Sequence, residues 1–297
     1  MNILSGFVDG TLLGGYYAMI ACGLSFMFGV MKIINLAHGT LAVLAAFALW
    51  TISEKIGLNP FLALIVVLPA MAGLGWLLQR VVLERTARFG ELVPILGTFG
   101  LAIVIENTLF EQFGADTRSL APYVGSLSYD SFDLGSDFYV GTLAILTFGA
   151  AILILGGLQL FLSYTNLGRA IRATAEDPDT SELVGVNSRY VNAVAASIAL
   201  VTVGLAGLFL GLRTTFAPYG GSMQLIFGFE AAVIGGTGNL WGTLVGGIVL
   251  GTAQTLGARV HPEGFLLGGH AVFLLVLVGR MYVSLPYDRL FLKSKAG

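Results

Sequence analysis

The sequence predicts an all-α fold, a polytopic transmembrane helical bundle with about 8–10 spans, some of them short or re-entrant. Two observations carry this prediction. Only 11% of the 297 residues are charged and 56% are hydrophobic, whereas soluble domains carry about 25% charged residues. The apolar residues also gather in roughly nine stretches, each approaching the ~20 residues that cross a bilayer.

In chain order, the apolar stretches cover residues 6–29, 36–52, 60–80, 92–112, 139–163, 190–212, 223–236, 240–258 and 267–285. Two of them, 36–52 and 223–236, are short and contain glycine or polar residues, which is typical of half-helices or re-entrant segments. The N-terminus lacks the basic region of a cleavable signal peptide, so the first stretch is expected to be a mature spanning helix. The whole of 1–297 is predicted to form a single integral-membrane domain.

The distribution of basic residues predicts the orientation, because short cytoplasmic loops are enriched in Lys and Arg. Arginines lie in the 80–91 loop, in the 164–190 loop and in the C-terminal tail, whereas the 113–138 loop is acidic. The basic segments are therefore expected at the cytoplasmic face. The acidic loop and the N-terminus are expected at the opposite face.

Several catalytic motifs are missing from the sequence. It has no Gly-x-x-x-x-Gly-Lys-Ser/Thr phosphate loop, so this chain is not expected to hydrolyse ATP by that device. It has no His-Glu-x-x-His, its three histidines are far apart, and its single cysteine lies in an apolar run, so no metal site and no disulfide are predicted. The chain is not expected to be an enzyme, and energy for transport would come from another subunit or an ion gradient.

Polar side chains inside the apolar stretches are candidates for a substrate pathway, because ionisable groups at membrane depth usually face a cavity or a partner. Asn35 and His38 flank the entry to the second stretch, and Gly39 follows them. His38 either lines a pathway or bonds a carbonyl group at a helix end. The alternatives for Glu230 are contact with a substrate, a bond to a neighbouring helix, and an ion pair with a distant arginine such as Arg213.

A glycine-rich run at 235–242 joins the stretches 223–236 and 240–258. It superficially resembles a dinucleotide-binding fingerprint, but that motif requires a preceding strand, which the sequence does not supply. We expect a break between two membrane helices, whose freed backbone groups line a cavity or are buried in protein. The predicted pathway residues are Asn35, His38, Gly39, Glu230, Gly235, Gly236 and Gly238.

Glycines also recur four residues apart in the second half of the chain, at Gly207 and Gly211, Gly242 and Gly246, and Gly247 and Gly251. Small residues at this spacing let helices approach closely in lipid. The pattern favours a tightly packed bundle over one whose helices slide or part.

The charged segment after the fifth stretch is typical of a docking element for a soluble partner. Asn166 is expected to cap a short helix in which Arg169 and Arg172 share one face and Ile171 and Ala175 form an apolar ridge. Pro178 is expected to end or turn this helix. A second short helix through 181–184 is predicted to stop at a glycine, Gly185.

Three blocks of sequence resemble the permease subunits of branched-chain amino acid ABC importers, specifically the shorter H-type subunit. The blocks are Gly29 to Gly39 with its Asn-x-Ala-His-Gly pattern, Leu167 to Asn187, and Ala231 to Gly242. Their order and spacing and the chain length also fit, so the resemblance covers nearly the whole protein. The sequence departs from the family at Phe227, where many relatives have lysine, and at Glu230, where many have a neutral residue.

The resemblance implies a permease domain in the bacterial cytoplasmic (inner) membrane, multi-pass in the lipid bilayer. Its implied partners are a second related permease subunit, two cytoplasmic ATP-binding subunits and an external substrate-binding protein, with no nucleic acid. No cofactor is implied for this chain, because ATP is used by the partner subunits. The segment at about 164–190 would be the cytoplasmic coupling segment, with these residues inserted into a cleft of the ATPase: Gly168, Arg169, Ala170, Arg172, Glu176, Asp177 and Gly185.

The implied function is ATP-driven import of branched-chain or other hydrophobic amino acids, with alternating access driven by the ATPase subunits. Related permeases serve urea, short amides and small carboxylates, so a urea/amide or small-carboxylate ABC permease is the alternative. An ion-coupled secondary transporter that works alone, with Glu230 as a proton carrier, is a further alternative from another class.

Overall fold

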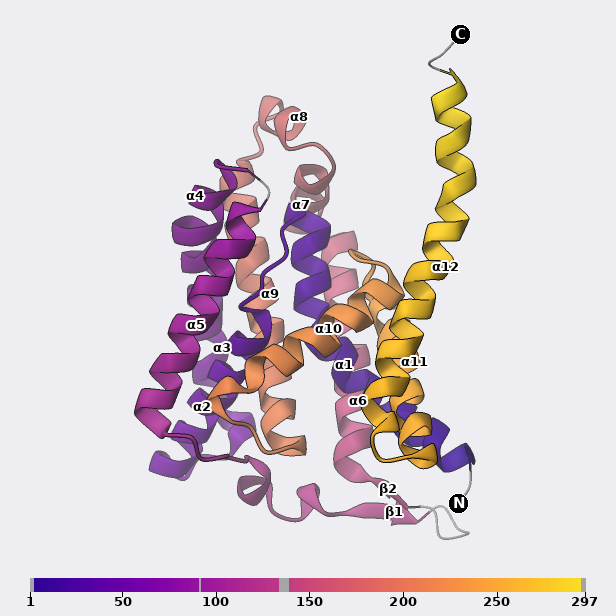
Figure 1. Cartoon of the computed structure of the whole chain (residues 1–297). Coiled ribbons are helices and arrows are strands. Elements are labelled where there is room, and N and C mark those ends of the chain that lie inside the picture. The colour runs from indigo at the N-terminus through magenta and orange to yellow at the C-terminus, as the bar shows by residue number, and fades with distance from the viewer. Residues whose placement is uncertain (1–2, 91, 134–138, 295–297) are drawn as a thin grey trace.

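The structure is a computed structural model that describes residues 3–90, 92–133 and 139–294. Within these residues the regular secondary structure is helical apart from two short antiparallel strands, β1 (Ser131–Asp133) and β2 (Tyr139–Gly141). The all-α prediction is therefore confirmed. Figure 1 shows the helices gathered into one bundle, with the coloured chain ending in α12 at its edge.

The long helices are α1 (Ile3–Met31), α2 (His38–Ile56), α3 (Pro60–Leu77), α5 (Val93–Phe113), α6 (Thr142–Tyr164), α9 (Ser188–Arg213), α10 (Gly221–Gly235), α11 (Leu240–Val260) and α12 (Gly264–Ser294). The shorter elements are a π-helical turn η1 (Leu78–Leu83), α4 (Glu84–Ala87), α7 (Asn166–Glu176), α8 (Pro178–Leu183) and the 3-10 turns η2 (Ala121–Ser128) and η3 (Pro218–Gly220).

By length and composition, six helices of the described part of the chain could cross a membrane, or seven if α10 and α11 count as one bent span. These numbers are lower than the number of apolar stretches for two reasons. The stretches 223–236 and 240–258 form a pair bent by 116°, and the apolar part of α12, Gly264–Arg280, is short. The stretch 36–52 is not a half-helix, because α2 has 19 residues and passes the same test.

The connection between α1 and α2 is the main irregular backbone within the bundle. Residues 32–37 are non-helical, and Figure 1 shows them returning from the end of α1 into the bundle, where α2 begins. The side-chain oxygen of Asn35 accepts a hydrogen bond from the Ala37 amide at 3.0 Å, and Thr98 on α5 accepts one from the Leu36 amide at 3.0 Å. These bonds satisfy backbone groups that would otherwise be costly at this depth.

The most extensive helix contact joins α1 and α11 through glycines, as the small-residue spacing predicted. A Cβ atom on Gly14 would lie 2.4 Å from the Ile248 Cα, and one on Gly251 would lie 2.4 Å from the Gly10 carbonyl oxygen. The backbones therefore touch, which replaces side-chain interdigitation as the source of packing in lipid.

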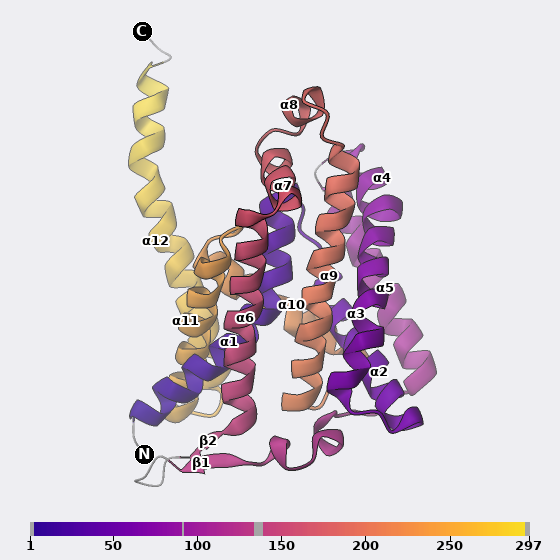
Figure 2. The ribbon, with the colours of Figure 1, turned by 180° about the vertical axis from the view of Figure 1, so that it is seen from behind.

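The two ends of the bundle carry different segments. Figures 1 and 2 show α4, α7 and α8 together at one end, and β1, β2 and the start of α1 at the other. The arginine-bearing segments thus share one face, opposite the acidic connection between α5 and α6, as the charge distribution predicted. The face of α4, α7 and α8 is accordingly assigned to the cytoplasm.

Candidate functional site

The first part of the site is the segment formed by α7 and α8. Its first helix begins one residue earlier than predicted, at Asn166, because Thr165 is the N-cap: the Thr165 hydroxyl accepts a hydrogen bond from the Gly168 amide at 2.9 Å. The Asn166 side chain instead accepts a hydrogen bond from Arg169. The prediction that Asn166 caps the helix is wrong, since threonine and asparagine can both cap and they are adjacent here.

Gly168 fixes α7 against the end of α6. A Cβ atom at this position would lie 2.4 Å from the Phe161 carbonyl oxygen and 2.6 Å from the Leu162 Cα. On the same helix Ile171 is fully buried, so the expected apolar ridge faces the bundle and is not offered to a partner. The exposed apolar side chains are further along, at Leu183 and Val184, which are 87% and 76% exposed.

Asp177 joins α7 to α8, which begins at Pro178. Its carboxylate accepts hydrogen bonds from the Thr180 hydroxyl at 2.5 Å and from the Thr180 amide at 3.1 Å. These bonds stabilise the charged form and lower the pKa of Asp177 below its usual value. The second helix ends at Leu183, and Gly185 follows with a φ of 90°, the stop that the sequence predicted.

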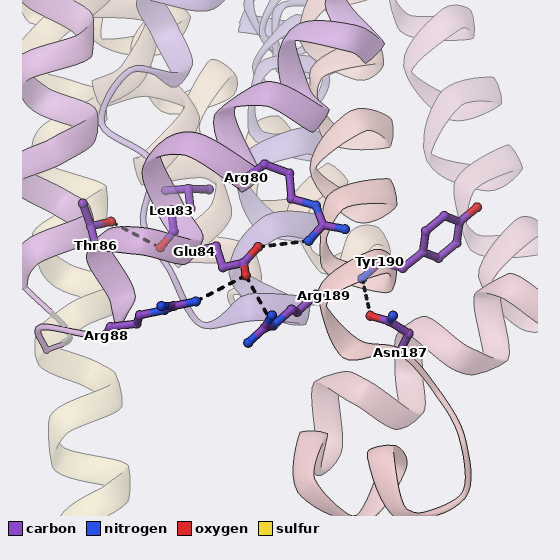
Figure 3. A network of polar contacts seen from close by, with 8 residues as sticks. All are labelled: Arg80, Leu83, Glu84, Thr86, Arg88, Asn187, Arg189 and Tyr190. Carbon is purple, nitrogen blue, oxygen red and sulfur yellow. Dashed lines mark hydrogen bonds and ion pairs between the residues drawn. The ribbon is translucent and has the colours of Figure 1, made fainter.

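A cluster of arginines beside this segment was not foreseen from the sequence. Glu84 forms ion pairs with Arg80 at 3.3 Å, Arg88 at 3.8 Å and Arg189 at 3.3 Å. Figure 3 shows all three arginine side chains turned toward the Glu84 carboxylate. The first two lie one helical turn from Glu84, a spacing visible in the sequence. Arg189 comes from the start of α9, a contact that only the fold supplies.

A cavity of about 210 Å³ links α7 to the glycine-rich break. Arg172 and Ala175 line it from α7, Gly29 from α1 and Gly238 from the break. The two backbones approach so closely that a Cβ atom on Gly29 would lie 3.0 Å from the Gly238 Cα. Residues predicted as two separate sets, coupling and pathway, therefore meet at this end of the bundle.

The break itself is a tight turn. Gly236 and Gly238 have φ values of 94° and 87°, which favour glycine, and a Cβ atom on Gly235 would lie 2.0 Å from the Gly242 carbonyl oxygen. Asn239 caps α11 by accepting a hydrogen bond from the Gly242 amide at 3.0 Å. Gly235 is thus needed where α10 and α11 cross, whereas Gly238 borders the cavity.

Among the predicted pathway residues, Asn35, His38 and Gly39 are buried. The Nε2 atom of His38 lies 2.8 Å from the Ile20 carbonyl oxygen of α1, to which it donates. A Cβ atom on Gly39 would lie 2.0 Å from the Gly221 carbonyl oxygen, so α2 crosses the start of α10 here. Of the two alternatives for His38, the structure shows the bond to a carbonyl group.

Glu230 is 3% exposed, and its Oε1 atom lies 2.5 Å from the Nδ1 atom of His270 on α12. Its partner is thus a histidine forty residues away. The suggested partner, Arg213, instead lies 5.3 Å from the centre of the Tyr16 ring. The sequence could not identify His270, because nothing in it shows which face of α12 meets α10.

A second cavity, of about 330 Å³, lies on the side of α10 that faces α5 and α12. Its lining is apolar except for one carboxylate, and consists of Ile34, Leu36, Ile95, Leu225, Ile226, Phe229, Glu230 and Phe273. Asn35 and His38 do not line it. They fix the non-helical segment whose neighbouring residues Ile34 and Leu36 do.

No group of three metal-ligating side chains occurs among the residues that the structure describes. The site is therefore a set of helix contacts, an apolar cavity with one carboxylate, and a charged segment at one membrane face.

Known proteins resemble this chain along almost its whole length. The family described as "Branched-chain amino acid transport system / permease component" matches residues 6–285. The high-affinity branched-chain amino acid transport system permease protein BraD of Pseudomonas aeruginosa is 30% identical over 296 residues, and LivH of Escherichia coli K12 is 27% identical over 291, each alignment covering 94% of both chains. The fructose import permease protein FrcC of Rhizobium meliloti is 26% identical over 259 residues, 84% of this chain and 68% of its own. No solved structure matches significantly.

Proposed function

Because the chain belongs to the family of branched-chain amino acid transport system permease components, we propose that its substrates are branched-chain or other hydrophobic amino acids. It is a permease subunit of an ABC importer and a multi-pass protein of the inner membrane. Its partners are other components of such an importer. In our proposal these are a second related permease, two cytoplasmic ATP-binding subunits and an external substrate-binding protein, and this chain binds no cofactor of its own.

The observation that carries the substrate class is the apolar cavity beside α10. Branched-chain side chains are apolar, and they favour a surface such as that of Leu225, Ile226 and Phe229 over water. Glu230 adds one carboxylate to this lining, which suits the ammonium group of an amino acid. Urea and short amides do not need such a lining, so this cavity favours amino acids over the alternative.

We assign the pathway role to Glu230 and supporting roles to the other predicted residues. Asn35, His38 and Gly39 keep the segment 32–37 and the start of α2 in place beside the cavity. Gly235, Gly236 and Gly238 form the turn that changes shape when α10 and α11 move. Alternating access then consists of motion of this turn relative to α1.

We assign coupling to the segment 164–190, with Gly168, Arg169, Ala170, Arg172, Glu176, Asp177 and Gly185 in it. The exposed apolar tip, Leu183 and Val184, supports contact with a soluble subunit, because apolar side chains outside the membrane are stabilised by burial in an interface. Arg172 also lines the cavity that contains Gly238, so a displacement of α7 reaches the turn directly.

The test is uptake of radiolabelled leucine by the complete transporter in liposomes, with urea as a competing substrate. ATP-dependent leucine uptake that requires the ATP-binding subunits supports the proposal. Uptake by this chain alone would establish a secondary transporter, and uptake of urea without leucine would establish the alternative substrate.

The coupling assignment is tested by copurification of the ATP-binding subunits with Arg172→Glu and with Arg85→Glu. Both residues are exposed arginines at the same face, so the charge change is matched. We expect the subunits to be lost only with Arg172→Glu. Equal retention by both variants would refute the role of Arg172.

A further inference from the structure

The cluster of Arg80, Arg88 and Arg189 around Glu84 has more positive charge than its carboxylate can neutralise. Three guanidinium groups face one carboxylate, which leaves an excess of two positive charges. The side chains of Arg88 and Arg189 are 62% and 65% exposed, so their remaining donors are accessible. Guanidinium groups bind phosphate oxygens through paired hydrogen bonds.

Two aromatic side chains of the kind found at membrane–water interfaces lie next to the cluster, on the side toward the membrane centre. The Trp76 and Tyr190 rings are 5.6 Å apart and edge to face, and the Arg80 guanidinium lies 5.5 Å from the centre of the Trp76 ring. Trp76 on α3 precedes Arg80 in η1 by one helical turn, and Tyr190 follows Arg189 on α9. The arginines are therefore at headgroup depth, immediately outside the apolar zone.

Further along the same two helices is an apolar groove of about 410 Å³ between α3, α6 and α9. Ala72 lines it from α3, one turn before Trp76, and Gly157 lines it from α6. Ser197 lines it from α9, roughly 10 Å below Tyr190 at the rise of an α-helix. Figure 2 shows α6, α9 and α3 side by side on this side of the bundle, away from the face where α10 lies between α5 and α12 in Figure 1.

We propose that this strip of phosphate-binding arginines, interfacial aromatics and apolar groove binds one anionic phospholipid of the cytoplasmic leaflet. Its phosphate lies against Arg80 and Arg189, and an acyl chain lies in the groove beside Gly157. Charge complementarity and the order of the three zones along α3 and α9 favour a phospholipid over a soluble anion, which has no use for the groove. The lipid joins α3 and α4 to the start of α9, directly after the α7–α8 segment.

The test is native mass spectrometry of the complete transporter, comparing bound phosphatidylglycerol with bound phosphatidylcholine. Wild type should prefer phosphatidylglycerol. The double variant Arg80→Gln/Arg189→Gln should lose this preference by about fivefold for each arginine removed. The matched control is Arg85→Gln, which removes an exposed charge from the same segment and should leave the preference unchanged.

The groove is tested separately with Gly157→Leu. A Cβ atom on Gly157 meets no heavy atom within 4 Å, so leucine fills the groove without a backbone clash and should reduce the occupancy of both lipids. Gly149→Leu on the same helix is the control, because its Cβ is equally unobstructed and Gly149 does not line the groove.

Three results would overturn the proposal. Equal retention of the two lipids by wild type would remove the headgroup selectivity. Binding of glycerol phosphate as tight as that of phosphatidylglycerol, with no effect of Gly157→Leu, would leave an anion site only. Loss of a partner subunit from either variant, with lipid retention unchanged, would show that a protein occupies this strip.

Discussion

The imidazole of His38 donates from Nε2 to the carbonyl oxygen of Ile20 at 2.8 Å, which fastens the first residue of α2 to the middle of α1. This bond crosses from one helix to the next at the point where the chain re-enters the bundle. It gives the histidine a structural role in an apolar stretch, although His38 does not line the apolar cavity beside α10.

We expect His38→Ala to lower stability by about 1–3 kcal/mol, because it leaves a buried carbonyl group without its partner. The measurement is the thermal unfolding midpoint of the purified complex, alongside leucine uptake per folded molecule. His261→Ala, in the exposed connection before α12, serves as the control. A variant with an unchanged midpoint and no uptake would mean that His38 acts on the substrate.

Gly168→Ala should displace α7 from the end of α6, since the new Cβ would lie 2.4 Å from the Phe161 carbonyl oxygen. Overpacking of this kind costs about 1–3 kcal/mol. We expect a loss of substrate-stimulated ATP hydrolysis with the membrane bundle still folded. Gly149→Ala, whose Cβ meets nothing within 4 Å, should leave hydrolysis at the wild-type rate, and a matching loss there would argue against a specific role for α7.

Replacement of Asp177 tests the cap of α8. Asp177→Ala removes the acceptor for Thr180 and should weaken association with the ATP-binding subunits, whereas Asp177→Asn, which can also cap, should retain most of it. Copurification yield is the measurement. Equal yields from both variants would contradict a role for the cap.

The pH dependence of the same cap follows from its lowered pKa. A carboxyl group with a depressed folded-state pKa contributes stability above its unfolded pKa and loses it as the pH falls through the folded value. Because the pKa of Asp177 lies below 3.8, its carboxyl group stays charged above about pH 5, and its titration should not change association in that range. A difference between wild type and Asp177→Asn that appears between pH 5 and 7 would disagree with this assignment.

The pair of Glu230 and His270 should show strong coupling. His270→Ala leaves the buried Glu230 side chain without its hydrogen-bond partner, which costs about 1–3 kcal/mol. Adding Glu230→Gln removes the charge, so the double variant should be more stable than His270→Ala alone. Thermal unfolding of the four proteins in this cycle measures the coupling, and purely additive effects would show that the two side chains act independently.

Glu230→Gln alone separates transport from stability. The amide has the shape of the carboxylate, so we expect the complex to assemble. Leucine uptake should fall by roughly tenfold or more, because loss of a charged hydrogen bond to the substrate costs ~1.4 kcal/mol or more. Glu111→Gln, at the exposed end of α5, is the control. Wild-type uptake by Glu230→Gln would exclude contact with the substrate.

The helical fold was predictable because most apolar stretches have nearly the length needed to cross a bilayer, and apolar side chains in lipid need no specific partner for the helix to form. The sidedness was predictable because Lys and Arg are enriched in short cytoplasmic loops. The pairing of side chains between different helices was not predictable. Glu84 and Arg189 are distant in sequence, and so are Glu230 and His270. In both pairs the approach depends on how helices rotate about their axes, which glycine contacts decide after the helices have formed.

Local capping was only partly predictable, for a related reason. Thr165 and Asn166 are both good N-caps, and the choice between them depends on where Gly168 contacts α6. Asp177 was placed in the coupling segment, but its cap of α8 depends on Pro178 starting a helix rather than only ending one.

The burial of α1 has a consequence for how the protein is made. In the most apolar 18-residue part of α1, 83% is buried. The Tyr17 hydroxyl donates a hydrogen bond to Gln254, a residue 237 positions later in the chain. α1 is the first helix to leave the ribosome, but its glycine face is therefore covered only after α11, almost the last helix, has been made. During synthesis that face is exposed to lipid and to insertion factors. A chain truncated before α11 would present it permanently, which would mark the product for membrane proteases.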